Sequence, residues 1–291
     1  MNHRKRTVST IVFSIFVCLI GLTGSFAGSL RYGLRDEAIE TLATEWELSQ
    51  MQITKIADRM SMAQFFVVMV QTPGIEEQGA VNLLDADYTR NFIAAKIRDY
   101  REDLLKKTGK GRVDFADIAA LEETCREEIC RDLGYNVTAE DMERYEILWD
   151  NLGLDERFIL DHYRENKPGI FGLARALLSD WFLALALLLA AGGCVGLWFL
   201  NGRSFSGHRI YGTALLTLGV LDCAAAAACE LLADAVNRAV NMRSNVMDLF
   251  FAPVGDMLLL LGMFSAVLGA GLIVLSVWEK MRLKKRGRRK K

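Results

Sequence analysis

One stretch of the chain decides its class of fold, residues 249–278, with the sequence LFFAPVGDMLLLLGMFSAVLGAGLIVLSVW. Its only charged residue is Asp256. A helix needs about 20 apolar residues to cross a hydrocarbon core of about 30 Å, because each residue rises about 1.5 Å. Residues 7–30, 176–200 and 210–232 meet the same condition. Since lipid offers no partner to unpaired backbone groups, the sequence predicts four membrane-spanning helices.

Charged residues are divided unevenly between the connecting segments. The whole chain has a formal net charge of −1, yet residues 1–6, 201–209 and 279–291 are basic, whereas residues 31–175 carry 19 basic and 29 acidic residues. By the positive-inside rule, the basic segments are cytoplasmic and residues 31–175 and 233–248 lie outside. We therefore expect a multi-pass plasma-membrane protein with both termini in the cytoplasm.

The first apolar stretch has two interpretations. Its basic start, its apolar run and the small-x-small sequence Ser25-Phe26-Ala27 are also features of a cleaved signal peptide. The run is longer than the usual signal core of about 7–15 residues, which favours a retained anchor. Residues 31–175 are exported under either interpretation.

The exported segment has the periodicity of helices. Apolar residues three, four and seven apart predict an amphipathic helix from about residue 35 to residue 71, ended by Pro73-Gly74. Further helices are expected to start near residues 85–87, 114–117, 138 and 155. The apolar run 65–70 also suits a buried strand, but no second run of its kind lies nearby to pair with it, so we assign it to the first helix.

These features predict an all-α membrane protein, with four transmembrane helices and a helical extracytoplasmic domain inserted between the first and the second. The expected parts are a basic cytoplasmic N-terminus with the first transmembrane helix (1–30), the extracytoplasmic domain (31–175), a three-helix transmembrane region (176–278) and a basic cytoplasmic tail (279–291). At about 145 residues, the extracytoplasmic domain is long enough to bury a core of its own.

Two of the six cysteines, Cys125 and Cys130, lie in the exported segment, where thiols can oxidise. On an unbroken helix, residues five apart have Cα atoms about 8–9 Å apart, beyond the limit of about 7 Å for a disulfide. A bridge therefore requires a break in the helix, and a disulfide and free thiols are both open. No nearby histidine completes a metal site, so we expect no metal and no cofactor.

Asp222 is the one acid well inside a predicted span. A charge at that depth costs several kcal/mol, and no Lys or Arg of the spans lies at the same level, so we expect the carboxyl group to be protonated and to face inward. Helix geometry places Thr23 and Ser265 near the same level, and Glu230 and Asp256 nearer the outer surface. Two roles are open for this intramembrane polar site: a neutral acid that fixes helix packing, and a proton relay.

Small residues indicate where helices approach closely. Gly24 and Gly28 form a GxxxG pair, and Gly262 and Gly269 lie on one side of the fourth span. Such contacts form within one chain or between the chains of a homo-oligomer, and the sequence leaves both open. The basic tail 279–291 is expected to bind anionic lipids of the inner leaflet, and nucleic-acid binding is not expected because no folded module accompanies the tail.

The exported segment contains a single histidine, His162, so a hydrolase would depend on one residue. We therefore expect the exported helical domain to bind or organise an extracytoplasmic or membrane partner, as an interaction, sensing or assembly module rather than an enzyme. One alternative is a membrane-embedded enzyme that acts on lipid or lipid-linked substrates through carboxylates at the outer leaflet. Another is an oligomeric transporter subunit, for which no inverted repeat is seen.

Overall fold

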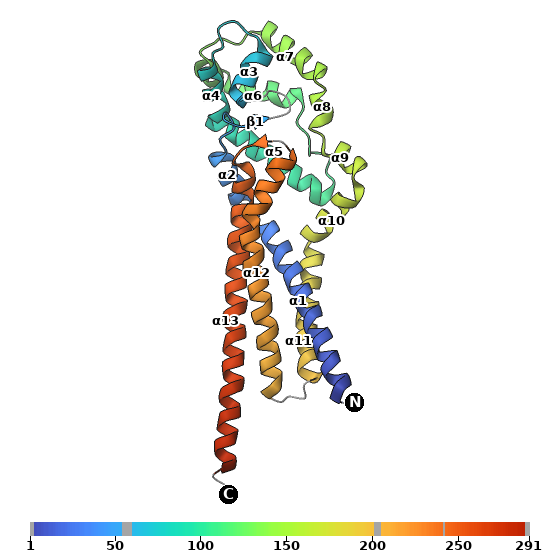
Figure 1. Ribbon diagram of the computed structural model, residues 1–291. Coiled ribbons are helices and arrows are strands. Elements are labelled where there is room, and N and C mark those ends of the chain that lie inside the picture. The colour runs from blue at the N-terminus through green and yellow to red at the C-terminus, as the bar shows by residue number, and fades with distance from the viewer. Residues whose placement is uncertain (1–2, 54–59, 201–204, 241, 289–291) are drawn as a thin grey trace. The chain divides into compact units, whose positions relative to one another are not determined.

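The computed structural model describes residues 3–53, 60–200, 205–240 and 242–288, and the chain separates into two compact units. Unit 1 comprises Met1–Tyr32, Leu177–Glu230 and Ala252–Lys291, and unit 2 comprises Gly33–Ala176 and Leu231–Phe251. Almost all regular structure in the described part of the chain is helical (Figure 1).

Four long apolar helices supply unit 1. They are α1 (His3–Gly33), α11 (Asp180–Leu200), α12 (Phe205–Val240) and α13 (Val246–Arg288). Each contains a segment long and apolar enough to cross a membrane: Ser9–Gly33, Asp180–Leu197, His208–Arg238 and Val246–Arg282. The prediction of four helices of spanning length is confirmed, and these helices identify the chain, by length and composition, as a multi-pass membrane protein.

Helix α12 contacts each of the other three helices of unit 1. Cys18 Sγ of α1 donates a hydrogen bond to the carbonyl oxygen of Ala214 at 3.4 Å. The hydroxyl of Tyr211 donates to the carbonyl oxygen of Cys194 on α11. On another side, glycines of α12 lie against α13, which runs antiparallel beside it (Figure 1). The spans therefore pack into one bundle with α12 as the shared element.

Besides the segment Leu231–Phe251, unit 2 consists of shorter helices, of which the last, α10, lies mostly within it. They are α2 (Asp36–Glu45), α3 (Met62–Val70), α4 (Glu77–Asp85), α5 (Asp87–Lys106), α6 (Phe115–Leu133), α7 (Ala139–Asn151), α8 (Leu154–Arg157), α9 (Leu160–Asn166) and α10 (Pro168–Leu178). Capping boxes at Ser61, Asp114 and Thr138 start α3, α6 and α7. The largest buried cluster joins α3, α6 and the segments that follow them: Val70, Ile75, Ile129, Leu133 and Val137.

The predicted continuous helix from residue 35 to residue 71 is wrong. Helix α2 ends at Glu45, and α3 begins after Ser61, whose hydroxyl accepts a hydrogen bond from Gln64 N at 3.1 Å. Between the two helices, the Ser49 hydroxyl donates to Asp85 at 2.5 Å. Hydrogen bonds between distant residues therefore override the helical period of the apolar residues. The run 65–70 is helical, as expected.

The connection between α12 and α13 belongs to unit 2. The two-residue strands β1 (Gln52–Ile53) and β2 (Met242–Arg243) pair antiparallel. Beside them, Trp46 Nε1 donates a hydrogen bond to Ser244 Oγ at 2.9 Å. The compact helical unit is therefore assembled from two parts of the sequence, whereas the predicted domain contained only residues 31–175.

Candidate functional site

A polar cleft of about 720 Å³ lies in unit 2, lined by α4, the start of α5 and one face of α6. We call it the acidic cleft, because its charged lining residues are Asp85, Asp87, Glu128, Asp132 and Arg131. The lining therefore carries four carboxyl groups and one guanidinium group. The lining contains no histidine.

Local sequence explains how these side chains reach one cleft. Asp85 ends α4 and Asp87 begins α5, so the short junction between the helices presents both acids. Glu128 and Asp132 are four residues apart and lie on the same face of α6. The adjoining face of α6 carries Ile129, which is part of the buried core.

Two of the four acids are held by hydrogen bonds. Asp85 accepts from the Ser49 hydroxyl at 2.5 Å, and Asp132 accepts from the Tyr88 hydroxyl at 3.0 Å. Burial, together with the hydrogen bond to Asp132, raises the pKa of Tyr88, so its hydroxyl remains a donor at neutral pH. Asp87 and Glu128 are exposed. Asp87 also lies 3.8 Å from Arg90 Nη1. The cleft thus has two carboxylates held by hydrogen bonds and two exposed ones, an arrangement that suits a positively charged group.

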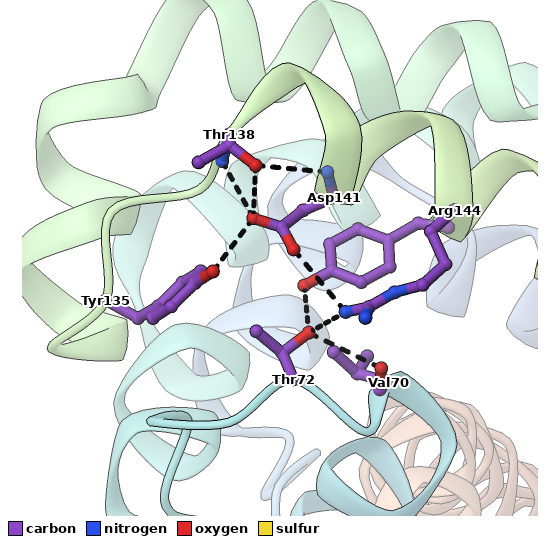
Figure 2. A network of polar contacts seen from close by, with 7 residues as sticks. Val70, Thr72, Tyr135, Thr138, Asp141 and Arg144 are labelled. Carbon is purple, nitrogen blue, oxygen red and sulfur yellow. Dashed lines mark hydrogen bonds and ion pairs between the residues drawn. The ribbon is translucent and has the colours of Figure 1, made fainter.

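A second polar network ties α7 to the turn that follows α3 (Figure 2). Asp141 Oδ2 accepts hydrogen bonds from Thr138 N at 3.0 Å, from Thr138 Oγ1 at 2.6 Å and from the Tyr135 hydroxyl at 3.0 Å. Arg144 Nη2 contacts both Asp141, at 3.4 Å, and Thr72. The hydrogen bonds from Thr138 hold the pKa of Asp141 below its ordinary value. Because these groups satisfy one another, the network is a structural support.

The five residues of the predicted intramembrane polar site differ in burial. Asp222 is fully buried. Glu230 and Asp256 are exposed, and so is Thr23, whose hydroxyl donates to the carbonyl oxygen four residues earlier, at 2.7 Å. Ser265 is half-buried. Asp222 is therefore the only buried acid of the three in this predicted set.

Cys125 and Cys130 are unbridged, and α6, the helix that carries them, is kinked between its two halves. Cys125 has non-helical backbone angles, φ −116° and ψ 24°, inside α6. Cys130 Sγ donates to Asn136 Oδ1 at 3.6 Å. Cys125 lines the acidic cleft. In the described part of the chain, no group of three His, Cys, Asp or Glu residues has the geometry of a metal site.

The four predicted packing glycines have different surroundings. A Cβ added to Gly262 would lie 2.8 Å from the carbonyl oxygen of Gly219, and one added to Gly269 would lie 2.6 Å from that of Gly212. The GxxxG pair of α1 is more open: a Cβ at position 24 would meet only an alanine side chain at 3.4 Å, and Gly28 has nothing within 4 Å.

The residues of the acidic cleft were not predicted as a site. A signal exists in the sequence, because Glu128 and Asp132 are like charges at positions i and i+4 of a helix, a pairing that destabilises a helix by about 0.2–0.5 kcal/mol. A second acidic pair, Asp85 and Asp87, lies about 40 residues earlier. Only the folded chain shows that the two pairs face the same space.

No protein-family model, curated protein or solved structure matches the chain.

Proposed function

We propose that this multi-pass membrane protein displays unit 2 outside the cell and uses the acidic cleft to bind a positively charged segment of an extracytoplasmic or membrane protein. The basic segments 1–6, 201–209 and 279–291 favour the cytoplasmic side for both termini. The acidic segment 31–175 is then outside. The protein acts as an interaction module, and its basic tail rests on anionic lipids of the inner leaflet.

The observation that carries the proposal is the accumulation of carboxylates in one cleft. Placing Glu128 and Asp132 on one face of a helix works against stability, as does bringing Asp85 and Asp87 close to them. Sequences that violate a local rule in this way commonly do so at functional sites. A lysine or arginine side chain that enters the cleft relieves the repulsion and gains charge-assisted hydrogen bonds.

The geometry gives less support to the two alternatives. An outer-leaflet enzyme or a transporter path requires Asp222, Glu230 and Asp256 to line one shared space. Two of these acids are exposed and the third is enclosed by the bundle.

The test measures binding of a fluorescent hexalysine peptide to the full-length protein in lipid nanodiscs without anionic lipid. We expect saturable binding by fluorescence anisotropy that weakens steeply with salt, because screening acts on exposed charges. Glu128→Gln should raise the dissociation constant at least threefold, since it removes an exposed carboxylate from the cleft.

Glu127→Gln is the matched control, because it removes the same charge from an exposed position of the same helix outside the cleft. Wild-type affinity is expected for this variant. Equal weakening by the two substitutions would mean that the peptide responds only to the overall acidity of unit 2, and the cleft would lose its assigned role.

A further inference from the structure

Asp222 on α12 is fully buried, and neither of its carboxyl oxygens has a hydrogen-bond partner among the described residues. The Ser25 hydroxyl faces the carboxyl group from α1 without reaching hydrogen-bond geometry to either oxygen. Buried polar groups in folded proteins are satisfied by protein, water or an ion, because an unsatisfied group is costly in an apolar interior. The unpaired carboxyl group of Asp222 therefore indicates that a ligand binds at this position.

Ser29 on α1 is a second fully buried group whose oxygen has no partner in the described part of the chain. Other span hydroxyls donate to the carbonyl oxygen four residues earlier, as Ser14 Oγ and Thr23 Oγ1 do at 2.9 and 2.7 Å. Because Ser29 does not make this bond, its hydroxyl oxygen is left to act as a ligand.

Two contacts set the register of α1 against α12. Cys18 Sγ donates to the carbonyl oxygen of Ala214, and Gly21 faces the side chain of Leu218. The residue numbers of the two pairs differ by 196 and by 197. A nearly constant difference is expected where two parallel helices pack side by side in one register. The serine that faces Asp222 differs from it by the same 197. All three contacts therefore belong to one seam.

Ser29 lies on the same face of α1, one helical turn further along this seam. At about 100° per residue, positions 18, 21, 25 and 29 fall within about 80° of the helix circumference. The next turn of α12 consists of alanines, residues 224–228, which add no polar side chain. One carboxyl group and two hydroxyl groups are thus concentrated in otherwise apolar surroundings.

We infer that Asp222, Ser25 and Ser29 bind a monovalent cation, Na⁺, between α1 and α12. Carboxylate and hydroxyl oxygens are hard ligands that suit such a cation. One carboxylate is neutralised by one monovalent charge, whereas a divalent ion would leave net positive charge in the apolar interior. Arg31, the nearest charged residue of α1, does not compete with the cation for Asp222, because it is paired with Asp180. This inference is independent of the acidic cleft and of the partner proposed for it.

The test follows thermal unfolding of the full-length protein in detergent by tryptophan fluorescence, while NaCl replaces choline chloride at constant ionic strength. A ligand that binds only the folded state raises Tm as its concentration passes the dissociation constant. We expect a saturable rise in Tm with Na⁺ for the wild type, and saturable binding of radiolabelled Na⁺. Both should be absent from Asp222→Asn.

Two further variants keep the test decisive if Asp222→Asn folds poorly. Ser29→Ala retains the carboxyl group and should raise the dissociation constant for Na⁺ at least tenfold. Ser14→Ala, on the same helix, removes a hydroxyl that is bonded to its own backbone and should bind Na⁺ as the wild type does. Identical unfolding of the wild type in NaCl and in choline chloride would overturn the inference, as would unchanged Na⁺ affinity in Ser29→Ala.

Discussion

Asp103 shows how one buried carboxylate can organise a loop of unit 2. Its side chain is 1% exposed, and Oδ1 accepts a hydrogen bond from Gly109 N at 2.7 Å. Oδ2 lies 3.3 Å from Arg164 Nη2 on α9. A Cβ at Gly111 would lie 2.7 Å from the same oxygen, so only glycine leaves room for this arrangement. The loop after α5 is therefore fixed by a residue of the preceding helix.

We expect Asp103→Asn to destabilise the protein by about 2 kcal/mol, because Arg164 Nη2 loses its carboxylate partner and only the ion pair of Nη1 with Asp161 remains. Thermal unfolding followed by tryptophan fluorescence should show a clear drop in Tm. The control is Glu102→Gln on the same helix, which removes the ion pairs with Lys106 and Lys110 at the surface and should leave Tm nearly unchanged. Equal Tm values for the two variants would contradict the role of Asp103.

Asp141 predicts a pH dependence whose sign follows from its lowered pKa. The stabilisation is present above the unfolded-state pKa of about 3.9 and is lost as the pH falls through the lower folded-state pKa. The Tm of the wild type should therefore exceed that of Asp141→Asn by a constant amount above about pH 5, and the difference should shrink below about pH 4.

The measurement is a series of unfolding curves from pH 7 to pH 3 for both proteins. Asp150→Asn, near the exposed end of the same helix, is the control for removal of a carboxylate from α7. A difference between the wild type and Asp141→Asn that grows as the medium becomes more acidic would reverse the predicted sign.

Among the elements, α12 and α13 approach one another closely enough for their backbones to meet. Gly255, Gly262 and Gly269 recur every seven residues on α13, and Gly212 and Gly219 have the same spacing on α12. A Cβ at Gly219 would lie 2.5 Å from the carbonyl oxygen of Gly262. The obstructing atoms belong to the backbone, so a side chain cannot be accommodated unless the helices separate.

Gly262→Ala is expected to destabilise the bundle by about 1–3 kcal/mol, the usual range for overpacking. Gly271→Ala is a matched control on the same helix, because a Cβ there meets nothing within 4 Å. Thermal unfolding in detergent should show a lowered Tm for the first variant and an unchanged or slightly raised Tm for the second. A drop of equal size in both would indicate that close packing is not the reason.

Hydropathy predicted the spans because lipid imposes one simple requirement, about 20 apolar residues in a helix. Capping residues were similarly reliable: Asp114 and Thr138 start helices where the sequence indicates them. The helix expected over 35–71 failed because a local pattern carries no information about a distant partner. The hydroxyl of Ser49 bonds to Asp85, and no periodicity of the intervening residues reveals it.

The candidate site was harder to predict for the same reason. Its acids come from two helix ends and one helix face that meet only in the folded chain. Asp222 is the opposite case, because an acid in an apolar span is conspicuous in the sequence itself. The depth of a residue in the membrane can be counted along its own helix. Which face the neighbouring helix turns toward that residue cannot be read from the sequence. The structure buries Asp222, leaves Glu230 and Asp256 exposed, and brings Ser25 to Asp222.

At the scale of the whole molecule, the asymmetry of charge leads to a test of topology. A single cysteine introduced at Asn151, an exposed position at the end of α7, should react with a membrane-impermeant maleimide added to intact cells. A cysteine at Lys290, in the basic tail, should react only after the cells are opened. The experiment uses a background in which the six native cysteines are replaced. Labelling of the tail cysteine alone in intact cells would invert the proposed orientation.

The pairing of β1 with β2 also bears on how the protein is made. Ribosomes deliver the chain from its N-terminus, so residues 33–176 emerge long before β2. In the proposed topology, the segment that completes unit 2 reaches the outer side only when α12 and α13 have been inserted as a hairpin. Until that moment Trp46 lacks its Ser244 partner and β1 has an open edge. In this topology, the last two helices to be synthesised determine when unit 2 completes its folding. A nascent chain released after α11 would leave unit 2 incomplete, and quality-control proteases could recognise it.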